Sequence, residues 1–85
     1  MYERAVQLIE AELGDEILTL DEEAGKCFGF NSVAASVWRQ LARPAAFDEL
    51  RQTLLDEYEV SWEQCTAELT ELLDELTSQG LIRRR

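Results

Sequence analysis

Residues 16–30 read EILTLDEEAGKCFGF, two short apolar runs with a polar segment between them. The runs are Glu16–Leu20 and Lys26–Phe30, and the segment Asp21–Gly25 ends in glycine, which adopts a positive φ angle at no steric cost. Apolar runs of this length around such a segment are typical of two antiparallel strands. The stretch therefore predicts a β-hairpin with a five-residue loop.

The segment before the hairpin, residues 4–13, is compatible with two structures. Ile9, Ala11 and Leu13 alternate as in a strand. Val6, Ile9 and Leu13 also have helical spacing, and alanine, glutamate and leucine favour a helix. A Gly-Asp pair follows directly and is typical of a tight turn. This turn favours a strand, which with the hairpin would make a three-stranded meander.

Three amphipathic helical patterns follow, at about residues 32–43, 47–58 and 62–79. Asn31 or Ser32 is the expected N-cap of the first helix, and Pro44 ends it. The third helix begins at Ser61-Trp62-Glu63-Gln64, a capping-box sequence, and Gly80 follows its end. Its core stripe consists of Cys65, Leu69, Leu72, Leu73 and Leu76.

These elements predict an α+β fold in a single domain, residues 1–85. A three-stranded antiparallel sheet, with strands at about residues 5–31, precedes three helices at about residues 32–80. The helical part is winged-helix-like, which raises a DNA-binding regulator as an alternative function.

The charge of the chain weakens that alternative. Eighteen acidic and 8 basic residues give a net charge of −10, which repels nucleic-acid phosphates and anionic membranes and favours cationic partners. The exposed positions of the third predicted helix include Glu63, Glu68, Glu71, Asp74 and Glu75. We expect no nucleic-acid and no membrane partner, and we interpret the basic tail 83–85 as a solvated chain end.

Groups that carry catalysis or bind metals are scarce. The sequence has no histidine, and two lone cysteines, Cys27 and Cys65, do not make a zinc site. We expect no enzyme, no cofactor and no metal, with Cys65 as a small apolar filler and the role of Cys27 open. No apolar run is long enough to span a membrane and the N-terminus has no signal-peptide pattern, so we expect a cytoplasmic protein.

A binding surface is the remaining candidate site. The strand Lys26–Phe30 would be the edge of the meander, with an open row of backbone N–H and C=O groups. The third helix carries an uncharged stripe beside its core stripe, formed by Thr66, Thr70, Leu73 and Thr77. The threonines of this stripe either sit half exposed without a role or, if they lie beside the open strand, complete a groove for an extended peptide. The predicted peptide-binding residues are Lys26, Cys27, Phe28, Gly29, Phe30, Thr66, Leu69, Thr70, Leu73, Asp74 and Thr77.

Several segments, in their order and spacing, resemble the PqqD-like family. They are Leu20–Lys26, Phe30-Asn31, Val37-Trp38, Leu50 with Leu54-Leu55, Tyr58–Ser61, the leucine-rich third helix and Gly80-Leu81. Members of this family are known as RiPP recognition elements, and the resemblance covers nearly the whole chain from about Val6. The chain departs from the family pattern at Cys27, Phe30, Ala46 and Glu68.

The resemblance implies a function as well as a fold. It implies a strand at residues 4–13, and a domain that binds the leader of a ribosomally synthesised precursor peptide at the third strand and third helix. A stand-alone protein of the lasso-peptide B1 type would deliver the precursor to a leader peptidase and a cyclase. The alternative is a peptide carrier in pyrroloquinoline quinone biosynthesis that works with a radical SAM enzyme. The net charge suits a basic leader.

Overall fold

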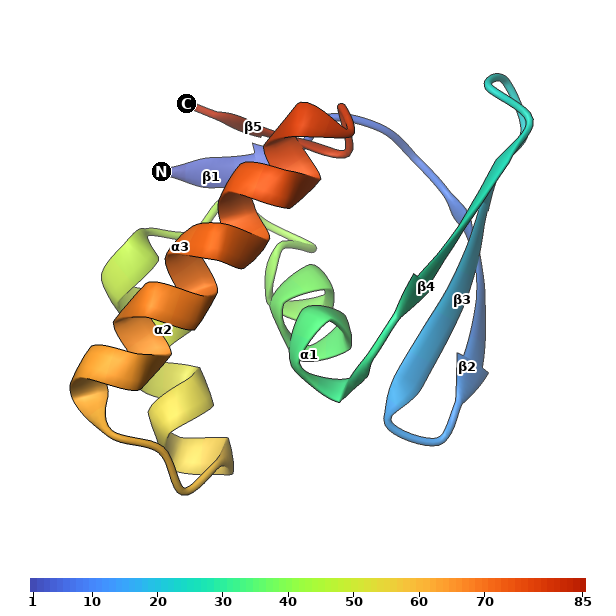
Figure 1. The fold of residues 1–85 in the computed structure, drawn as a ribbon. Coiled ribbons are helices and arrows are strands. Elements are labelled where there is room, and N and C mark those ends of the chain that lie inside the picture. The colour runs from blue at the N-terminus through green and yellow to red at the C-terminus, as the bar shows by residue number, and fades with distance from the viewer.

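The computed structural model describes residues 1–85 and has an α+β architecture with two small sheets and three helices (Figure 1). The elements are β1 (Tyr2–Arg4), β2 (Ile9–Leu13), β3 (Glu16–Asp21), β4 (Lys26–Phe30), α1 (Ser32–Gln40), α2 (Phe47–Glu57), α3 (Trp62–Ser78) and β5 (Ile82–Arg84). The predicted fold class is confirmed, with the second sheet as an addition.

The three-stranded sheet has the order β2-β3-β4, and both strand pairs are antiparallel. Asp21 pairs with Lys26, so the hairpin loop has only residues 22–25, one fewer than predicted, because Asp21 continues β3. Gly25 has a φ of 66°, as the turn requires. The ambiguous segment forms a strand at Ile9–Leu13, and the helical interpretation is wrong.

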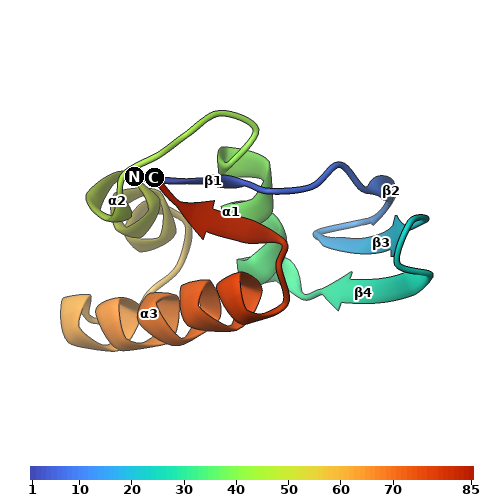
Figure 2. The ribbon, with the colours of Figure 1, turned by 90° about the horizontal axis from the view of Figure 1, so that it is seen from above.

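A second sheet joins the two ends of the chain and was not predicted. β1 pairs antiparallel with β5 (Figure 2), and in this pairing Glu3 lies opposite Arg83. The interpretation of residues 83–85 as a solvated end is therefore wrong for the backbone, and the side chains of Arg83 and Arg85 both contact Glu3. Strands of three residues rich in charged side chains carry no apolar alternation, which is why the sequence pattern did not indicate them.

Local hydrogen bonds fix the helix ends. Asn31 Oδ1 accepts from the backbone N–H of Ala34 at 3.0 Å, and Ser61 Oγ accepts from that of Gln64 at 3.1 Å. The Gln64 side chain does not return to Ser61 but donates to Glu68, so only half of the predicted capping box forms. α1 ends at Gln40, before Pro44, which therefore lies beyond the helix and does not itself terminate it.

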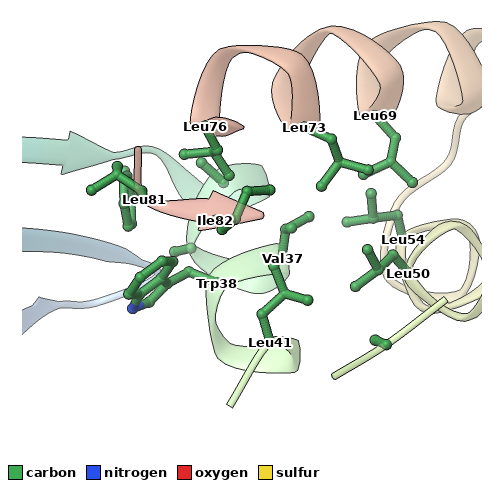
Figure 3. Packing of buried hydrophobic residues seen from close by; sticks show 14 of the residues in the cluster. Val37, Trp38, Leu41, Leu50, Leu54, Leu69, Leu73, Leu76, Leu81 and Ile82 are labelled. Atoms are coloured by element: carbon green, nitrogen blue, oxygen red, sulfur yellow. The ribbon is translucent and has the colours of Figure 1, made fainter. Parts of the chain in front are cut away.

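The core lies where the three helices and the segment after α3 meet (Figure 3). Trp38 of α1 is fully buried, and its ring centroid lies 5.4 Å from that of Phe30 in β4, which couples the sheet to the helices. Ile17 of β3 is buried with it, and other large core side chains converge from every helix and from the segment after α3: Val37, Leu41, Leu50, Leu54, Leu69, Leu73, Leu76, Leu81 and Ile82. Leu81 and Ile82 pack back on the core and are 1% and 2% exposed.

Candidate functional site

β4 is an edge strand of the three-stranded sheet, with a hydrogen-bonded neighbour on one side only. Side chains alternate along it: Phe30 is buried and Phe28 half-buried, whereas Cys27 and Gly29 are exposed. Phe30 anchors the strand to the core, so the open edge is held in a fixed position beside the helices. An edge of this kind is a template for strand addition.

A groove of about 430 Å³ runs between this edge and α3. Its strand side consists of Cys27–Phe30 and Asn31, and Ala34 and Leu81 contribute to its floor. Its helix side is formed by Leu72, Glu75, Leu76 and Gln79. We call this the β4–α3 groove; most of its lining residues are hydrophobic, and the open backbone of β4 together with Glu75 and Gln79 supplies polar groups.

The predicted threonine stripe does not line the β4–α3 groove. Thr66, Thr70 and Thr77 each donate a hydroxyl hydrogen bond to the carbonyl four residues earlier in α3, at 2.7–2.8 Å. Arg51 of α2 donates to the Thr66 hydroxyl, which places this flank toward α2. Leu69 and Leu73 are buried in the core, and Asp74 is exposed outside the groove.

Helix geometry explains the difference. Each residue advances about 100° around a helix. With Leu69, Leu73 and Leu76 facing the core, Leu72 and Gln79 fall on one side of that stripe and the threonines on the other. Both flanks of the core stripe can be recognised in the sequence, but which of them faces β4 depends on how α3 packs against the rest of the protein. The peptide-binding role of the threonine flank stays a prediction, but the premise that it lies beside the open strand is wrong.

A smaller apolar pocket lies nearer the N-terminus of α3, on the flank that also carries Leu72 and Gln79. Its volume is about 80 Å³, and it is lined by Val33, Leu54, Tyr58, Val60, Cys65, Glu68 and Leu69. Burial raises the pKa of the Cys65 thiol, and its Sγ lies 3.8 Å from the carbonyl oxygen of Arg51. Cys65 is thus a neutral packing residue, as predicted, and both cysteines are unpaired.

The flank of α3 that faces the β4–α3 groove is negatively charged. Glu68 and Glu75 are both exposed there, and neither forms an ion pair within the chain. Free carboxylates beside an apolar groove favour a ligand that combines apolar and cationic side chains. No group of three or more histidine, cysteine or carboxylate side chains is arranged to hold a metal ion. None of the three helices has both the length and the apolar character needed to cross a bilayer.

The family described as coenzyme PQQ synthesis protein D (PqqD) matches residues 16–82, which confirms the family resemblance of the sequence. The fold is similar to that of TbiB1, solved in complex with the TbiA(beta) leader peptide, with a TM-score of 0.85, 22% identity, and coverage of 98% of this chain and 96% of that chain. It is also similar to a lasso peptide synthetase B1 complexed with the leader peptide, with a TM-score of 0.81, 20% identity and 98% coverage of both chains. No curated protein matches the chain.

Proposed function

The chain belongs to the PqqD family, and from this membership we propose that it is a non-catalytic adaptor that binds the leader region of a ribosomally synthesised precursor peptide. The observation that carries the proposal is the β4–α3 groove, where an open strand edge lies beside an apolar helix flank with free carboxylates. The two similar structures, both complexes with leader peptides, support the same proposal.

Binding would proceed by strand addition. The leader extends the sheet as a fourth strand next to β4, so that its backbone forms hydrogen bonds that are independent of its sequence. Every second side chain then points into the groove, where Leu72 and Leu76 contact apolar residues and Glu75 attracts a basic one. Affinity thus comes from the edge, and sequence preference comes from α3.

Delivery is the second part of the proposal. In a lasso-type pathway the receiving enzymes would be a leader peptidase and a cyclase. One of the two similar structures is a lasso peptide synthetase B1, and the other is the protein TbiB1. The family description favours a second candidate, a peptide carrier in pyrroloquinoline quinone biosynthesis that works with a radical SAM enzyme. We place the protein in the cytoplasm, where two unpaired thiols are compatible with a reducing environment.

A titration of the labelled protein with the precursor peptide encoded beside its gene tests the proposal. Gln79→Arg should block the β4–α3 groove and weaken binding about tenfold or more, because it adds bulk and a charge that repels a basic leader. Thr70→Arg is the matched control, since it adds the same side chain at an exposed position on the opposite flank of α3. Loss of binding only in Thr70→Arg would place the peptide on the threonine flank, and unchanged binding in both would contradict a site on α3.

A further inference from the structure

The face of the β2–β3–β4 sheet turned away from α1 is apolar and uncovered. All three helices lie on the other side of this sheet (Figures 1 and 2). The strand register places on it Ile9, Ala11, Leu13, Leu18, Leu20, Cys27 and Gly29, with Glu16 as its one charged residue. We call these residues the outer sheet face; Ile9, Leu13 and Leu18 are 53%, 61% and 48% exposed.

β2 is oriented against the usual preference of a half-buried strand. Antiparallel sheets with one face on a core normally turn apolar residues inward and polar residues outward. Here Glu10 points toward α1 and accepts a hydrogen bond from the indole N–H of buried Trp38 at 2.9 Å. Glu12 lies on the same side and accepts one from Arg39 at 3.3 Å. The inward positions of β2 are therefore occupied by carboxylates.

These polar contacts hold the register that leaves the apolar residues outside. A slip of β2 by one residue would exchange its two faces and turn Ile9, Ala11 and Leu13 inward. The contacts of Glu10 oppose such a slip, because Arg4 also approaches its carboxylate, at 3.6 Å, and stacks 4.2 Å from the Trp38 ring centroid. Contiguous apolar surface that the register keeps exposed is typical of a protein-binding face.

The charges around the outer sheet face determine which partner it fits. Carboxylates stand at both ends of the sheet, with Asp15 and Glu16 at the β2–β3 turn and Glu22 and Glu23 at the β3–β4 loop. A second copy would bring the same acidic ends and the same net charge of −10, which opposes face-to-face pairing. A surface with an apolar centre and basic residues around it is complementary to both features.

We propose that the outer sheet face is the docking surface for a partner protein with an apolar contact centre and a basic rim. The identity of this partner rests on the proposed function, since we take it to be one of the enzymes that receive the bound peptide. A hollow of about 310 Å³ lies at the end of this face near the β2–β3 turn; Leu13 and Leu18 in its lining would contact an apolar side chain of the partner, and Glu16, which also lines it, suits a basic side chain beside it. Gly29, Phe30 and Asn31 line both this hollow and the β4–α3 groove, so enzyme and peptide lie next to each other across β4.

The test uses the full chain and each protein encoded beside its gene, purified singly, with binding measured by biolayer interferometry. The double variant Leu13→Asp/Leu18→Asp should weaken binding to one of these proteins about 30-fold or more, while its affinity for the precursor peptide changes less than about threefold. Trp62→Asp is the control, because Trp62 is 53% exposed but lies on α3, away from the sheet. Leu13→Thr/Leu18→Thr keeps strand propensity, should weaken binding about tenfold, and replaces the aspartate variant if that variant unfolds.

Three results would overturn the inference. The first is a wild-type chain that binds none of the encoded proteins. The second is a pair of folded double variants that bind these proteins as tightly as the wild type does. Alternatively, sedimentation velocity would show a wild-type dimer that both double variants dissociate while they retain enzyme binding, which would assign the face to a second copy. A wild-type chain that docks an enzyme through this face but binds no precursor peptide contradicts the proposed function and supports the docking surface.

Discussion

At the scale of single residues, Trp38 connects the sheet, the helices and the N-terminal segment. Its spacing with Ala34, Val37 and Leu41 is that of one helix face, and it is fully buried. Its hydrogen bond to Glu10 and the stacking of Arg4 on its ring could not be predicted, because the partners are brought together only by the tertiary fold. The apolar spacing in the sequence identified the buried ring but not the partner of its N–H group.

Glu10 is expected to stabilise the fold through this hydrogen bond. Glu10→Ala leaves the buried indole N–H of Trp38 without its acceptor, which should lower the free energy of unfolding by about 1–3 kcal/mol. Glu10→Gln retains a side-chain oxygen acceptor and should cost clearly less. Urea unfolding of the two variants makes the comparison, and an equal loss in both would attribute the effect to the charge of Glu10 instead.

Glu3 should make the stability depend on pH in the acid range. The hydrogen bond from Arg83 and the charges of Arg83 and Arg85 hold the pKa of Glu3 below its ordinary value, about 4.3, although burial opposes the shift. A carboxyl group with a lowered folded-state pKa stabilises the protein above the ordinary pKa, and this contribution is lost as the pH falls through the folded-state value. The stability difference between the wild type and Glu3→Gln should therefore be largest near neutral pH and shrink below about pH 4 in urea titrations. A difference that does not change between neutral and acid pH would contradict the ion pair.

At the scale of elements, the parts of the fold with strong local signals were predictable and the others were not. The hairpin and three helices follow from apolar periodicity, the caps at Asn31 and Ser61, and the glycines at positions 25 and 80. The β1–β5 pair was missed because its pairing joins the two ends of the chain. The strand half of the β4–α3 groove was predicted, but its helix half is lined by the flank opposite the threonines, since local spacing does not specify the rotation of α3 about its axis.

Proline in β4 tests whether the open edge itself binds peptide. Successive residues of a strand direct their N–H groups to opposite sides, so proline at Cys27 and at Phe28 removes one paired and one open donor. The substitution at the open position should weaken leader binding by more than about threefold with little change in melting temperature. The one at the paired position should mainly lower the melting temperature. Leader titration and thermal melting of both variants distinguish the cases, and two folded variants with wild-type affinity would exclude strand addition.

At the scale of the whole molecule, the negative charge is distributed over α3 rather than confined to the groove. Glu68 and Glu75 lie on the flank toward the β4–α3 groove, whereas Glu71 and Asp74 are exposed outside it. A basic leader can therefore respond to the charge in two ways. The summed field of the protein accelerates encounter with any cation, and the carboxylates next to the groove stabilise the bound complex. The same field opposes DNA binding, because it would bring carboxylates against phosphates.

Two double variants with equal net charge separate these contributions. Glu68→Gln/Glu75→Gln removes two carboxylates beside the groove, and Glu71→Gln/Asp74→Asn removes two elsewhere on α3. Both should slow association with a basic leader to a similar, small extent at low salt, because they reduce the total charge equally. Only the groove variant should also dissociate faster, with an affinity lower by about three- to tenfold and a flatter salt dependence, because exposed charge pairs contribute about 0.2–1 kcal/mol each and are screened by salt. Stopped-flow kinetics at two salt concentrations measures both rates. Equal dissociation rates in the two variants would mean that the leader responds to the overall field alone, and the side chains that select its sequence would then be the apolar residues of the groove, Leu72 and Leu76.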